Sequence, residues 1–477
     1  MKRRDFLKIS LGSALGITLT PPRLLLAATE PPPLFDISLA EWSLVKSLRA
    51  GTFTNLDFPR VARREFDIDC VEFVDQFFAD KANDKAYLTD LKQRGADEGV
   101  KLGLIMIDTT GDLGAAAKPA RDRAVLSTFA WIDAARFLGC HTIRINARGP
   151  QNREQLLDHI VESGQRLADH AGDLKVVIEN HGGLSSDPDW LVSVFQAVGR
   201  PNFGALPDFG NFPGEINRYD AVEKLMPHAK AVSAKATRFS PEGRIVDTDF
   251  PRMMRIVRDG GYHGHVGVES SADSQEEESS AIRHTRDALK AIRQQQARCH
   301  PIFNGKDLAG WTSIGNASWS VQNGVIVGKD GSGWSHNPDV AGTWLSSETQ
   351  YADFRFEFQY AINKGGNGGV FFRSSRDKNP AFNGYEFQIY DAPGTAPTKN
   401  GPGSIYDKVA PSRNLTRGAG EWNSVTLIAK GPEIVVEING EEVIRTELDQ
   451  SLKGYLGLQV HDEKSEVRFR NLRVEEL

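Results

Sequence analysis

Acidic residues stand at the ends of three short apolar segments in the first half of the chain. Glu179, Asp208 and Glu269 each close or follow such a segment, and glycine and asparagine residues come soon after the first two. In a barrel of parallel strands and alternating helices, the carboxyl ends of the strands meet at one mouth, where such barrels carry their chemistry. Three acids at one mouth repel each other unless a positive charge lies between them. The pattern therefore predicts an enzyme site in this half of the chain.

Apolar and amphipathic segments alternate from residue 34 to residue 297. The apolar segments, expected as strands, are Leu34–Leu39, Cys70–Val74, Lys101–Ile107, Thr142–Ile145, Lys175–Ile178, Phe203–Leu206, Ala229–Ala234 and His265–Val268. The amphipathic segments, expected as helices, are Phe58–Phe66, Asp84–Glu98, Arg121–Leu138, Arg153–His170, Pro188–Val198, Asp220–Met226, Pro251–Arg258 and Glu276–Gln296. Eight strands alternating with eight helices is the count of a (β/α)₈ TIM barrel, which we predict for residues 34–297.

The pattern changes after residue 297. Long helical segments disappear, and Asn-Gly pairs at 323–324 and 439–440 stand between apolar runs, as hairpin turns do. Asp353–Tyr360 and Glu433–Ile438 alternate apolar and polar residues, which is typical of half-buried antiparallel strands. We predict a second domain over residues 301–477, a β-sandwich of the jelly-roll type. Two domains also suit a chain of 477 residues, which is too long for one compact core.

The amino terminus has the pattern of an export signal. Basic residues including Arg3 and Arg4 precede Phe6-Leu7-Lys8, the apolar stretch Ile9–Leu19 follows, and Ala27-Ala28 offers a cleavage region. Residues 1–30 resemble a twin-arginine signal peptide, which implies export of the folded protein to the periplasm. The apolar stretch is too short to span a membrane comfortably, so no membrane association is expected beyond export.

Charge and cysteine content exclude some functions. A net charge of −6 with 25% charged residues does not suit a nucleic-acid or acidic membrane partner. Cys70 and Cys140 adjoin apolar segments and are expected as buried small hydrophobes. His263 and His265 lie where the eighth strand begins, away from the expected mouth, and a structural role is expected for them.

Carboxylate oxygens are the ligands that Mg²⁺ and Mn²⁺ prefer, and such an ion stabilises the enediolate formed when a proton leaves carbon beside a carbonyl. Other polar residues near strand ends are expected to shape the pocket: Glu41, Glu72, Asp108, Arg144 and Asn146. A charge inside an apolar strand needs a partner, so Glu72 and Arg144 either pair with each other or contact substrate. The ring of Trp42 either stacks against a sugar or packs against neighbouring side chains.

Several phrases of the first domain match one superfamily: Glu-Asn-His-Gly-Gly-Leu-Ser-Ser at 179–186, Leu-Pro-Asp-Phe-Gly-Asn at 206–211, Ala-Val-Ser-Ala-Lys at 231–235 and Gly-Val-Glu at 267–269. Residues 34–290 thus resemble the xylose-isomerase-like barrels of sugar isomerases and epimerases. That resemblance implies a divalent metal held by Glu, Asp, His and Glu, of which Glu179, Asp208 and Glu269 match three.

The match departs from the superfamily at the seventh strand. Ser233 stands where the superfamily usually has the ligand histidine, two residues before Lys235. Either His181 or water completes the metal shell, or the site works without metal around Lys235. The resemblance makes Glu179, Glu269 and Lys235 the catalytic candidates. The residues expected to contact substrate are His181, Arg144, Asn146 and Trp42.

In the second domain, Glu386 and Gln388 fall on one face of an expected strand, because side chains alternate along a strand. Asn367–Arg373 is a further strand that ends on an arginine. Polar groups gathered on one sheet face form a carbohydrate-binding trough, or they perform acid–base chemistry.

Residues 301–477 resemble the 3-keto-disaccharide hydrolase family of concanavalin-like jelly rolls. The resemblance rests on phrases that include Phe-Asn-Gly-Lys-Asp at 303–307, Asn-Gly-Gly-Val-Phe-Phe-Arg at 367–373, Gly-Tyr-Glu-Phe-Gln-Ile-Tyr-Asp at 384–391 and Phe-Arg-Asn at 469–471. It implies glycoside substrates whose C3 hydroxyl has been oxidised to a ketone. Glu386 or His461 is then the candidate base and Arg373 the candidate oxyanion partner. The candidates for binding substrate are Glu357, Gln388 and Asp391.

These resemblances favour an enzyme of 3-keto-glycoside breakdown, in which the jelly roll cleaves and the barrel hydrates or isomerises the keto-sugar. The alternative is a sugar isomerase or epimerase with a carbohydrate-binding module. A binding module needs exposed aromatic platforms, whereas a lyase needs a buried base. An endonuclease of the related barrel family is excluded by the charge and by the export signal.

Overall fold

The computed structural model describes residues 34–150, 152–332, 337 and 339–477. The predicted twin-arginine signal, residues 1–30, lies outside the described residues. Among the helices that are described, none is both long enough and apolar enough to cross a membrane.

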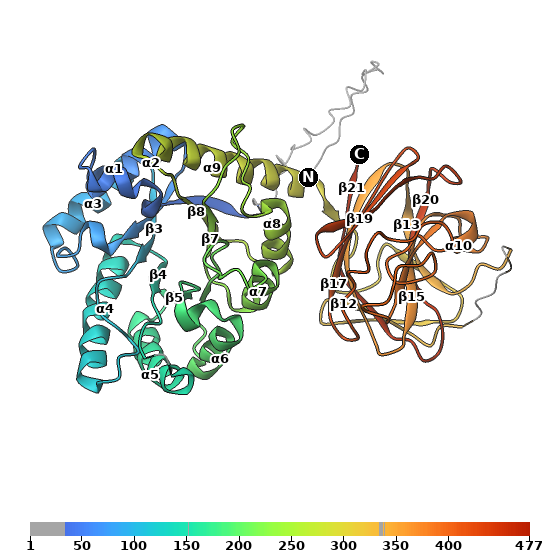
Figure 1. The fold of residues 1–477 in the computed structure, drawn as a ribbon, viewed down its shortest axis with the longest axis horizontal. Helices are drawn as coiled ribbons and strands as arrows, with labels where there is room; N and C mark the ends of the chain where they lie inside the picture. The colour runs from blue at the N-terminus through green and yellow to red at the C-terminus, as the bar shows by residue number, and fades with distance from the viewer. Residues whose placement is uncertain (1–33, 151, 333–336, 338) are drawn as a thin grey trace, which may run out of the picture. The chain divides into compact units, whose positions relative to one another are not determined.

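The first domain is a nearly closed barrel of eight parallel strands, which confirms the predicted TIM fold (Figure 1). The strands are β1 (Asp36–Ala40), β2 (Cys70–Val74), β3 (Lys101–Met106), β4 (Thr142–Ile145), β5 (Lys175–Glu179), β6 (Phe203–Leu206), β7 (Val232–Ala236) and β8 (His265–Ser270). Their order is β6-β5-β4-β3-β2-β1-β8-β7. Parallel bridges from Ala205 to Ala229 and from Asp208 to Ser233 join the two ends of this order.

Helices cover the outside of the barrel (Figure 1). They are α1 (Val45–Arg49), α2 (Phe58–Phe66), α3 (Lys85–Asp97), α4 (Lys118–Leu138), α5 (Arg153–Ala171), α6 (Pro188–Val198), α7 (Arg218–Leu225), α8 (Phe250–Asp259) and α9 (Gln275–Arg298). Outward-facing strand residues such as Val71 and Phe73 belong to the large apolar cluster that includes the helices. A smaller cluster that includes Val74 and Leu104 fills the interior.

The seventh strand begins later than the sequence pattern predicts. Ala229–Ala234 is the expected strand, but β7 runs from Val232 to Ala236. The residues Met226–His228, shortly before β7, form a 3₁₀ turn. Pro227 favours this turn, because proline suits the first positions of a helical turn. This shift places Lys235 inside the strand, where its side chain points toward the barrel mouth.

The second domain is an antiparallel sandwich of two sheets, consistent with the predicted jelly roll. One sheet has the order β10-β13-β20-β15-β16, formed by Trp311–Ile314, Trp344–Tyr351, Gly454–Val460, Asn367–Ser374 and Tyr385–Tyr390. The other has the order β11-β12-β21-β14-β17-β18-β19, formed by Ser318–Gln322, Val325–Lys329, Val467–Glu476, Phe354–Ile362, Asn423–Lys430, Glu433–Ile438 and Glu441–Glu447, with β9 (His300–Pro301) beside β21.

The alternation of side chains decides what each face of the five-stranded sheet carries. Phe387 and Ile389 of β16 are fully buried in the apolar core of the sandwich. Glu386 and Gln388 of the same strand therefore project from the opposite face. The short helix α10 (Pro380–Asn383) packs near this face, where Ala381 joins a small cluster with Trp344 and Phe371.

Candidate active sites at the barrel mouth and on the sandwich

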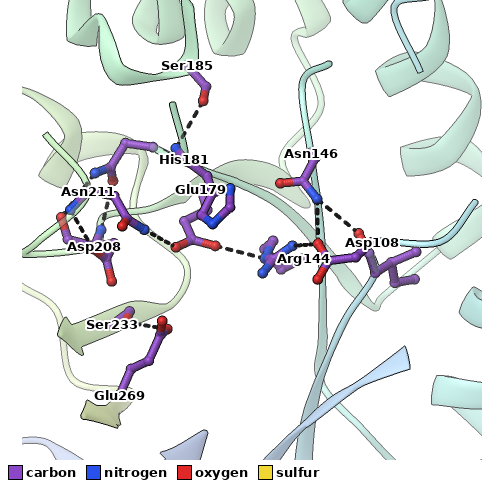
Figure 2. A network of polar contacts seen from close by, with 12 residues as sticks. Asp108, Arg144, Asn146, Glu179, His181, Ser185, Asp208, Asn211, Ser233 and Glu269 are labelled. Atoms are coloured by element: carbon purple, nitrogen blue, oxygen red, sulfur yellow. Dashed lines mark hydrogen bonds and ion pairs between the residues drawn. The ribbon is translucent and has the colours of Figure 1, made fainter. Parts of the chain in front are cut away.

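The barrel mouth brings together the three acids that the sequence predicts. Glu179 ends β5, Asp208 follows β6 and Glu269 lies near the end of β8. One carboxylate oxygen of each lies within 4.8 Å of the others, and all three residues are buried (Figure 2). Because the strands are parallel, their carboxyl ends share one edge of the barrel, which is why residues so far apart in sequence meet.

Asn180, directly after β5, holds Asp208 in place. Its Nδ2 donates to the Asp208 carbonyl at 3.0 Å, and its Oδ1 accepts from the Asp208 amide at 2.7 Å. Asp208 Oδ1 accepts from the amides of Gly210 and Asn211, both at 2.8 Å. Asp208 Oδ2 is buried and meets no donor at hydrogen-bonding geometry among the described residues, so it is the open acceptor of the site.

Arg144 lies inside the barrel between two carboxylates. Its Nη1 is 2.6 Å from Asp108 Oδ1, and its Nε is 2.8 Å from Glu179 Oε2 (Figure 2). Asn146 Nδ2 also donates to Asp108 Oδ1, at 2.6 Å. The predicted pair of Arg144 with Glu72 is wrong, because Glu72 instead accepts from the Ser38 hydroxyl at 2.5 Å.

Lys235 neutralises the third carboxylate. Its Nζ is 2.7 Å from Glu269 Oε1, and the Ser233 hydroxyl donates to Glu269 Oε2 at 3.2 Å. Burial by itself raises the pKa of Glu269, but Lys235, Arg144 and the Ser233 hydroxyl together outweigh it, so the pKa lies below its usual value. Burial raises the pKa of Glu179 and Asp208, although Arg144 and Lys235 respectively offset part of the effect.

The residues of the mouth fit a divalent cation. Among the residues that the structure describes, the four carboxylates of Asp108, Glu179, Asp208 and Glu269 face two cations, Arg144 and Lys235. This set, when ionised, has an excess of two negative charges. No described residue donates to Asp208 Oδ2 at hydrogen-bonding geometry, although Ser233 lies close enough to lower the pKa of Asp208. Glu179, Asp208 and Glu269 would hold such an ion, and the oxygen-only donor set suits Mg²⁺ or Mn²⁺.

The other predicted pocket residues lie around this set. His181, two residues after the end of β5, is exposed as a whole residue. Partial desolvation of its ring lowers its pKa, and the positive charges of Arg144 and Lys235 act in the same direction. Its imidazole is not part of the carboxylate cluster. Trp42 is half-buried after β1 and packs edge-on against Phe77, with 5.8 Å between ring centroids.

Glu386 and Gln388 share the outer face of the five-stranded sheet with residues of three neighbouring strands. One cross-strand row is Ser346, Gly457, Phe371 and Glu386, and the next is Trp344, Gln459, Gly369 and Gln388. Gly369 is required beneath Glu386, because a Cβ at that position would lie 2.4 Å from Glu386 Oε1. The polar side chains of these rows, Ser346, Glu386, Gln388 and Gln459, form a polar platform beside the buried rings of Trp344 and Phe371, and the Glu386 carboxyl group lies over a glycine.

Glu386 is a buried carboxyl group without a cation. It is 5% exposed, and no ion pair to it occurs among the residues that the structure describes. Burial raises its pKa to about 8, although a hydrogen bond with Gln459 acts in the opposite direction. Buried acids with raised pKa values are characteristic of general acids and bases in active sites.

Arg373 does not lie in position to stabilise an oxyanion on this face. Its guanidinium is fully buried and donates to the carbonyls of Ala352 at 2.9 and 2.7 Å and Gly431 at 2.6 Å. It also contacts Asp353 Oδ1 at 3.3 Å. Arg373 thus holds a turn together, a role that the strand pattern could not distinguish from substrate contact.

The remaining predicted residues of the second domain lie at different places in the sandwich. Glu357 is on β14 of the other sheet, where Arg355 Nε lies 3.0 Å from its Oε1. Asp391 accepts from the Gly365 amide at 2.7 Å and so anchors a turn. His461 directly follows β20, and its amide donates to the Asn367 carbonyl at 3.1 Å at the start of β15. Gln388, two residues after Glu386 on β16, shares the face of Glu386.

Sequence reasoning missed three residues that position the acids. Asn180 and Asn211 brace the barrel carboxylates, and Gln459 bonds to Glu386. Asn180 directly follows Glu179, and Asn211 stands three residues after Asp208. Both lie within the motif phrases of the first domain, and that position was the available signal. Gln459 carries no such signal, because its contact with Glu386 depends on the pairing of β20 with β15 and β16.

Comparisons with known proteins support the assignment of both domains. Residues 299–475 match the family model described as "3-keto-alpha-glucoside-1,2-lyase-like domain", and residues 61–294 match that of the "Xylose isomerase-like TIM barrel". The chain therefore contains one domain that matches each of these two family models. The two domain resemblances drawn from the sequence are thereby confirmed at the level of the domain family.

Individual relatives each cover part of the chain. A 3-keto-disaccharide hydrolase of Bacteroides thetaiotaomicron is 25% identical over 272 residues, which span 44% of this chain and 92% of that protein. A solved structure from Parabacteroides distasonis, described as a glycosyl hydrolase, is 24% identical and covers 39% of this chain and 96% of its own, with a TM-score of 0.33. A xylose isomerase-like TIM barrel protein from Mycobacterium smegmatis in complex with magnesium is 14% identical and covers 54% and 98%, with a TM-score of 0.42.

Proposed function

We propose that the protein breaks down 3-keto-glycosides in the periplasm, with the sandwich cleaving the glycosidic bond and the barrel acting on the keto-sugar released. The observation that carries this proposal is Glu386, a buried carboxyl group with a raised pKa on the polar face of a domain from the 3-keto-glucoside lyase family. The relative from Bacteroides thetaiotaomicron supports the same substrate class.

The chemistry needs one base. A ketone at C3 acidifies the C2 proton, which Glu386 accepts. The electron pair forms a double bond between C1 and C2, and the bond from C1 to the aglycone oxygen breaks. The aglycone oxygen takes a proton from solvent as it leaves, the proton held by Glu386 is later returned to solvent, and a 3-keto-2-hydroxyglucal remains. Addition of water, with hydroxyl at C1 and hydrogen at C2, then completes a net hydrolysis.

The barrel mouth suits the second step. Glu269, which Lys235 keeps ionised, can accept a proton, whereas burial raises the pKa of Glu179 and Asp208, so these two carboxyl groups hold a proton more readily than Glu269 does when no cation is bound. When neighbouring carboxyl groups have different pKa values, the group with the lower pKa can act as the base and the group with the higher pKa as the acid. A divalent ion held there would stabilise negative charge on neighbouring sugar oxygens.

The alternative, a carbohydrate-binding module attached to a sugar isomerase, is less well supported by the sandwich face. Trp344 and Phe371 are fully buried, so they offer no surface for stacking a sugar. Tyr390 is 42% exposed and could contact one. A binding face has no use for a buried carboxyl group, because desolvating it costs free energy without contributing a contact.

Product analysis in D₂O tests the proposal. The full-length protein should release aglycone from a 3-keto-glucoside and leave the unoxidised glucoside intact. Deuterium should appear at C2 of the 3-keto-glucose product, beyond the spontaneous exchange measured without enzyme. Cleavage without label at C2 would show direct hydrolysis, and binding without cleavage would favour the alternative.

We expect the protein to bind about one divalent ion at the barrel mouth, which elemental analysis measures. Glu179→Gln or Asp208→Asn should weaken Mn²⁺ binding by more than the roughly 10–100-fold that loss of an outer partner causes. Glu72→Gln is the matched control, because Glu72 is also a buried carboxyl group inside the barrel but lies outside the cluster. A metal-free wild type whose turnover resists chelators would favour the mechanism built around Lys235.

A further inference from the structure

A second group of potential metal ligands lies at the opposite end of the barrel from the three carboxylates. Cys70 is the first residue of β2, His265 is the first residue of β8, and His141 directly precedes β4. Parallel strands begin at one edge and end at the other, so these residues gather at the base of the barrel. The Cys70 sulfur and one ring nitrogen of each histidine lie within 4.8 Å of one another.

The three side chains are arranged around one small space. His141 Nδ1 is 2.7 Å from the Thr142 hydroxyl, which leaves its Nε2 for another partner. A Cβ at Gly103 would lie 2.7 Å from Cys70 Sγ and 3.4 Å from His141 Nε2, so the glycine keeps this space open. The ring of His265 is nearly parallel to that of His141, with 5.6 Å between centroids.

One buried nitrogen of the group lacks a hydrogen-bond partner among the described residues. This nitrogen is His265 Nε2. A buried polar nitrogen without a partner costs free energy, and native structures rarely leave one so. If Cys70 and His265 only filled space, as their sequence context suggests, this nitrogen would remain unsatisfied. A bound cation would satisfy it.

We propose that Cys70, His141 and His265 bind a thiophilic divalent cation of the Zn²⁺ class. Cysteine sulfur and histidine nitrogen are the donors that Zn²⁺ prefers, and three protein ligands leave a fourth position for water. His141 is exposed, so solvent reaches the group. Binding replaces the thiol proton of Cys70, which passes to solvent. The ion would connect the starts of β2, β4 and β8 and so clamp the base of the barrel.

This site differs in chemical class from the barrel mouth. The mouth offers oxygen atoms only, which suit Mg²⁺ or Mn²⁺, whereas the base offers sulfur and nitrogen. The two sites can therefore be told apart by spectroscopy in the intact protein. The proposal for the base does not depend on the function of either domain.

Titration of the reduced full-length protein with Co²⁺, in excess Mg²⁺ that fills the carboxylate site at the mouth, tests the proposal. Coordination by Cys70 should give a near-ultraviolet band from charge transfer between thiolate and Co²⁺, and this band should saturate at one equivalent. Added Zn²⁺ should abolish it by displacing Co²⁺. Cys70→Ser should remove the band completely, and His265→Gln should weaken the binding of Co²⁺ at least tenfold.

Two cysteine variants are matched controls. Cys140 and Cys299 are also buried free thiols, but neither belongs to the group, so Cys140→Ser and Cys299→Ser should keep the band. Circular dichroism of Cys70→Ser establishes that the variant is folded. No charge-transfer band in the wild type, or an unchanged band in Cys70→Ser, would overturn the proposal.

Discussion

Replacing Glu386 with glutamine should slow the release of aglycone from a 3-keto-glucoside by roughly 10²–10⁴-fold, the usual effect of removing a positioned general base. Glutamine keeps the size and the polar contacts of the side chain but cannot accept a proton. Because the loss concerns the chemical step, it should appear in kcat more than in KM. Steady-state kinetics on the full-length variant measure it.

Glu348→Gln is the matched control for this experiment. Glu348 lies on β13 of the same sheet, but its side chain is exposed, so its loss should leave the rate unchanged. The substitution Arg373→Lys is informative in another way: it should destabilise the sandwich without a selective effect on kcat, because Arg373 holds a turn. Full activity of Glu386→Gln would remove Glu386 from the mechanism.

The raised pKa of Glu386 also predicts the pH dependence of the reaction. Burial raises this pKa to about 8, and a base must be ionised to act. Log kcat/KM should therefore rise with pH up to about 8 and level off above it. A profile that falls over this range would contradict the role of base.

Stability should change with pH in the opposite direction. The folded-state pKa of Glu386, about 8, lies above the reference value of 4.5. The folded state therefore binds more protons in that interval, and stability falls as the pH rises from 4.5 to 8, by at most about 1.4 kcal/mol per pH unit from this group. Denaturant unfolding of the sandwich at several pH values should show a shallower fall in Glu386→Gln.

Replacing Arg144 with methionine should destabilise the barrel by about 3–5 kcal/mol at pH 7, because two buried carboxylates lose their shared cation. Asp108 and Glu179 would then be left ionised inside the barrel or would have to bind protons. The loss should therefore become smaller as the pH falls toward 5. Denaturant unfolding of the full-length protein in the presence of a chelator measures the change.

Arg200→Met is the matched control for this variant. Arg200 also pairs with an aspartate, Asp169, but both side chains are more than a third exposed. Exposed pairs contribute only about 0–1 kcal/mol, because water solvates both charges in either state. Equal losses in the two variants would show that the interior pair has no special role. Any unfolding transition of the sandwich should remain unchanged in both.

Much of the barrel could be predicted from sequence because its signals are local. Short apolar strands, amphipathic helices and acids at strand ends each show in a few consecutive residues. The parallel topology then brings Glu179, Asp208 and Glu269 to one mouth without any further information. In the sandwich, the strand of Glu386 and the face on which it lies also follow from simple alternation.

Contacts between distant segments had to come from the tertiary structure. Arg144 pairs with Asp108 and Glu179 rather than with Glu72, because register and side-chain direction across several strands decide which charges meet inside a barrel. Arg373 and Glu386 belong to neighbouring strands, yet only Glu386 faces the polar platform, because the backbone of Arg373 has a φ of 52° that interrupts the alternation.

The amino-acid sequence by itself determined the two domain types, their order and the three acids of the barrel mouth, because these depend on periodicity and on strand ends. The tertiary structure alone decided which buried charge has a partner, and that Cys70, His141 and His265 share one space. Such groupings depend on the relative positions of strand starts in a closed barrel, which no local stretch of sequence encodes.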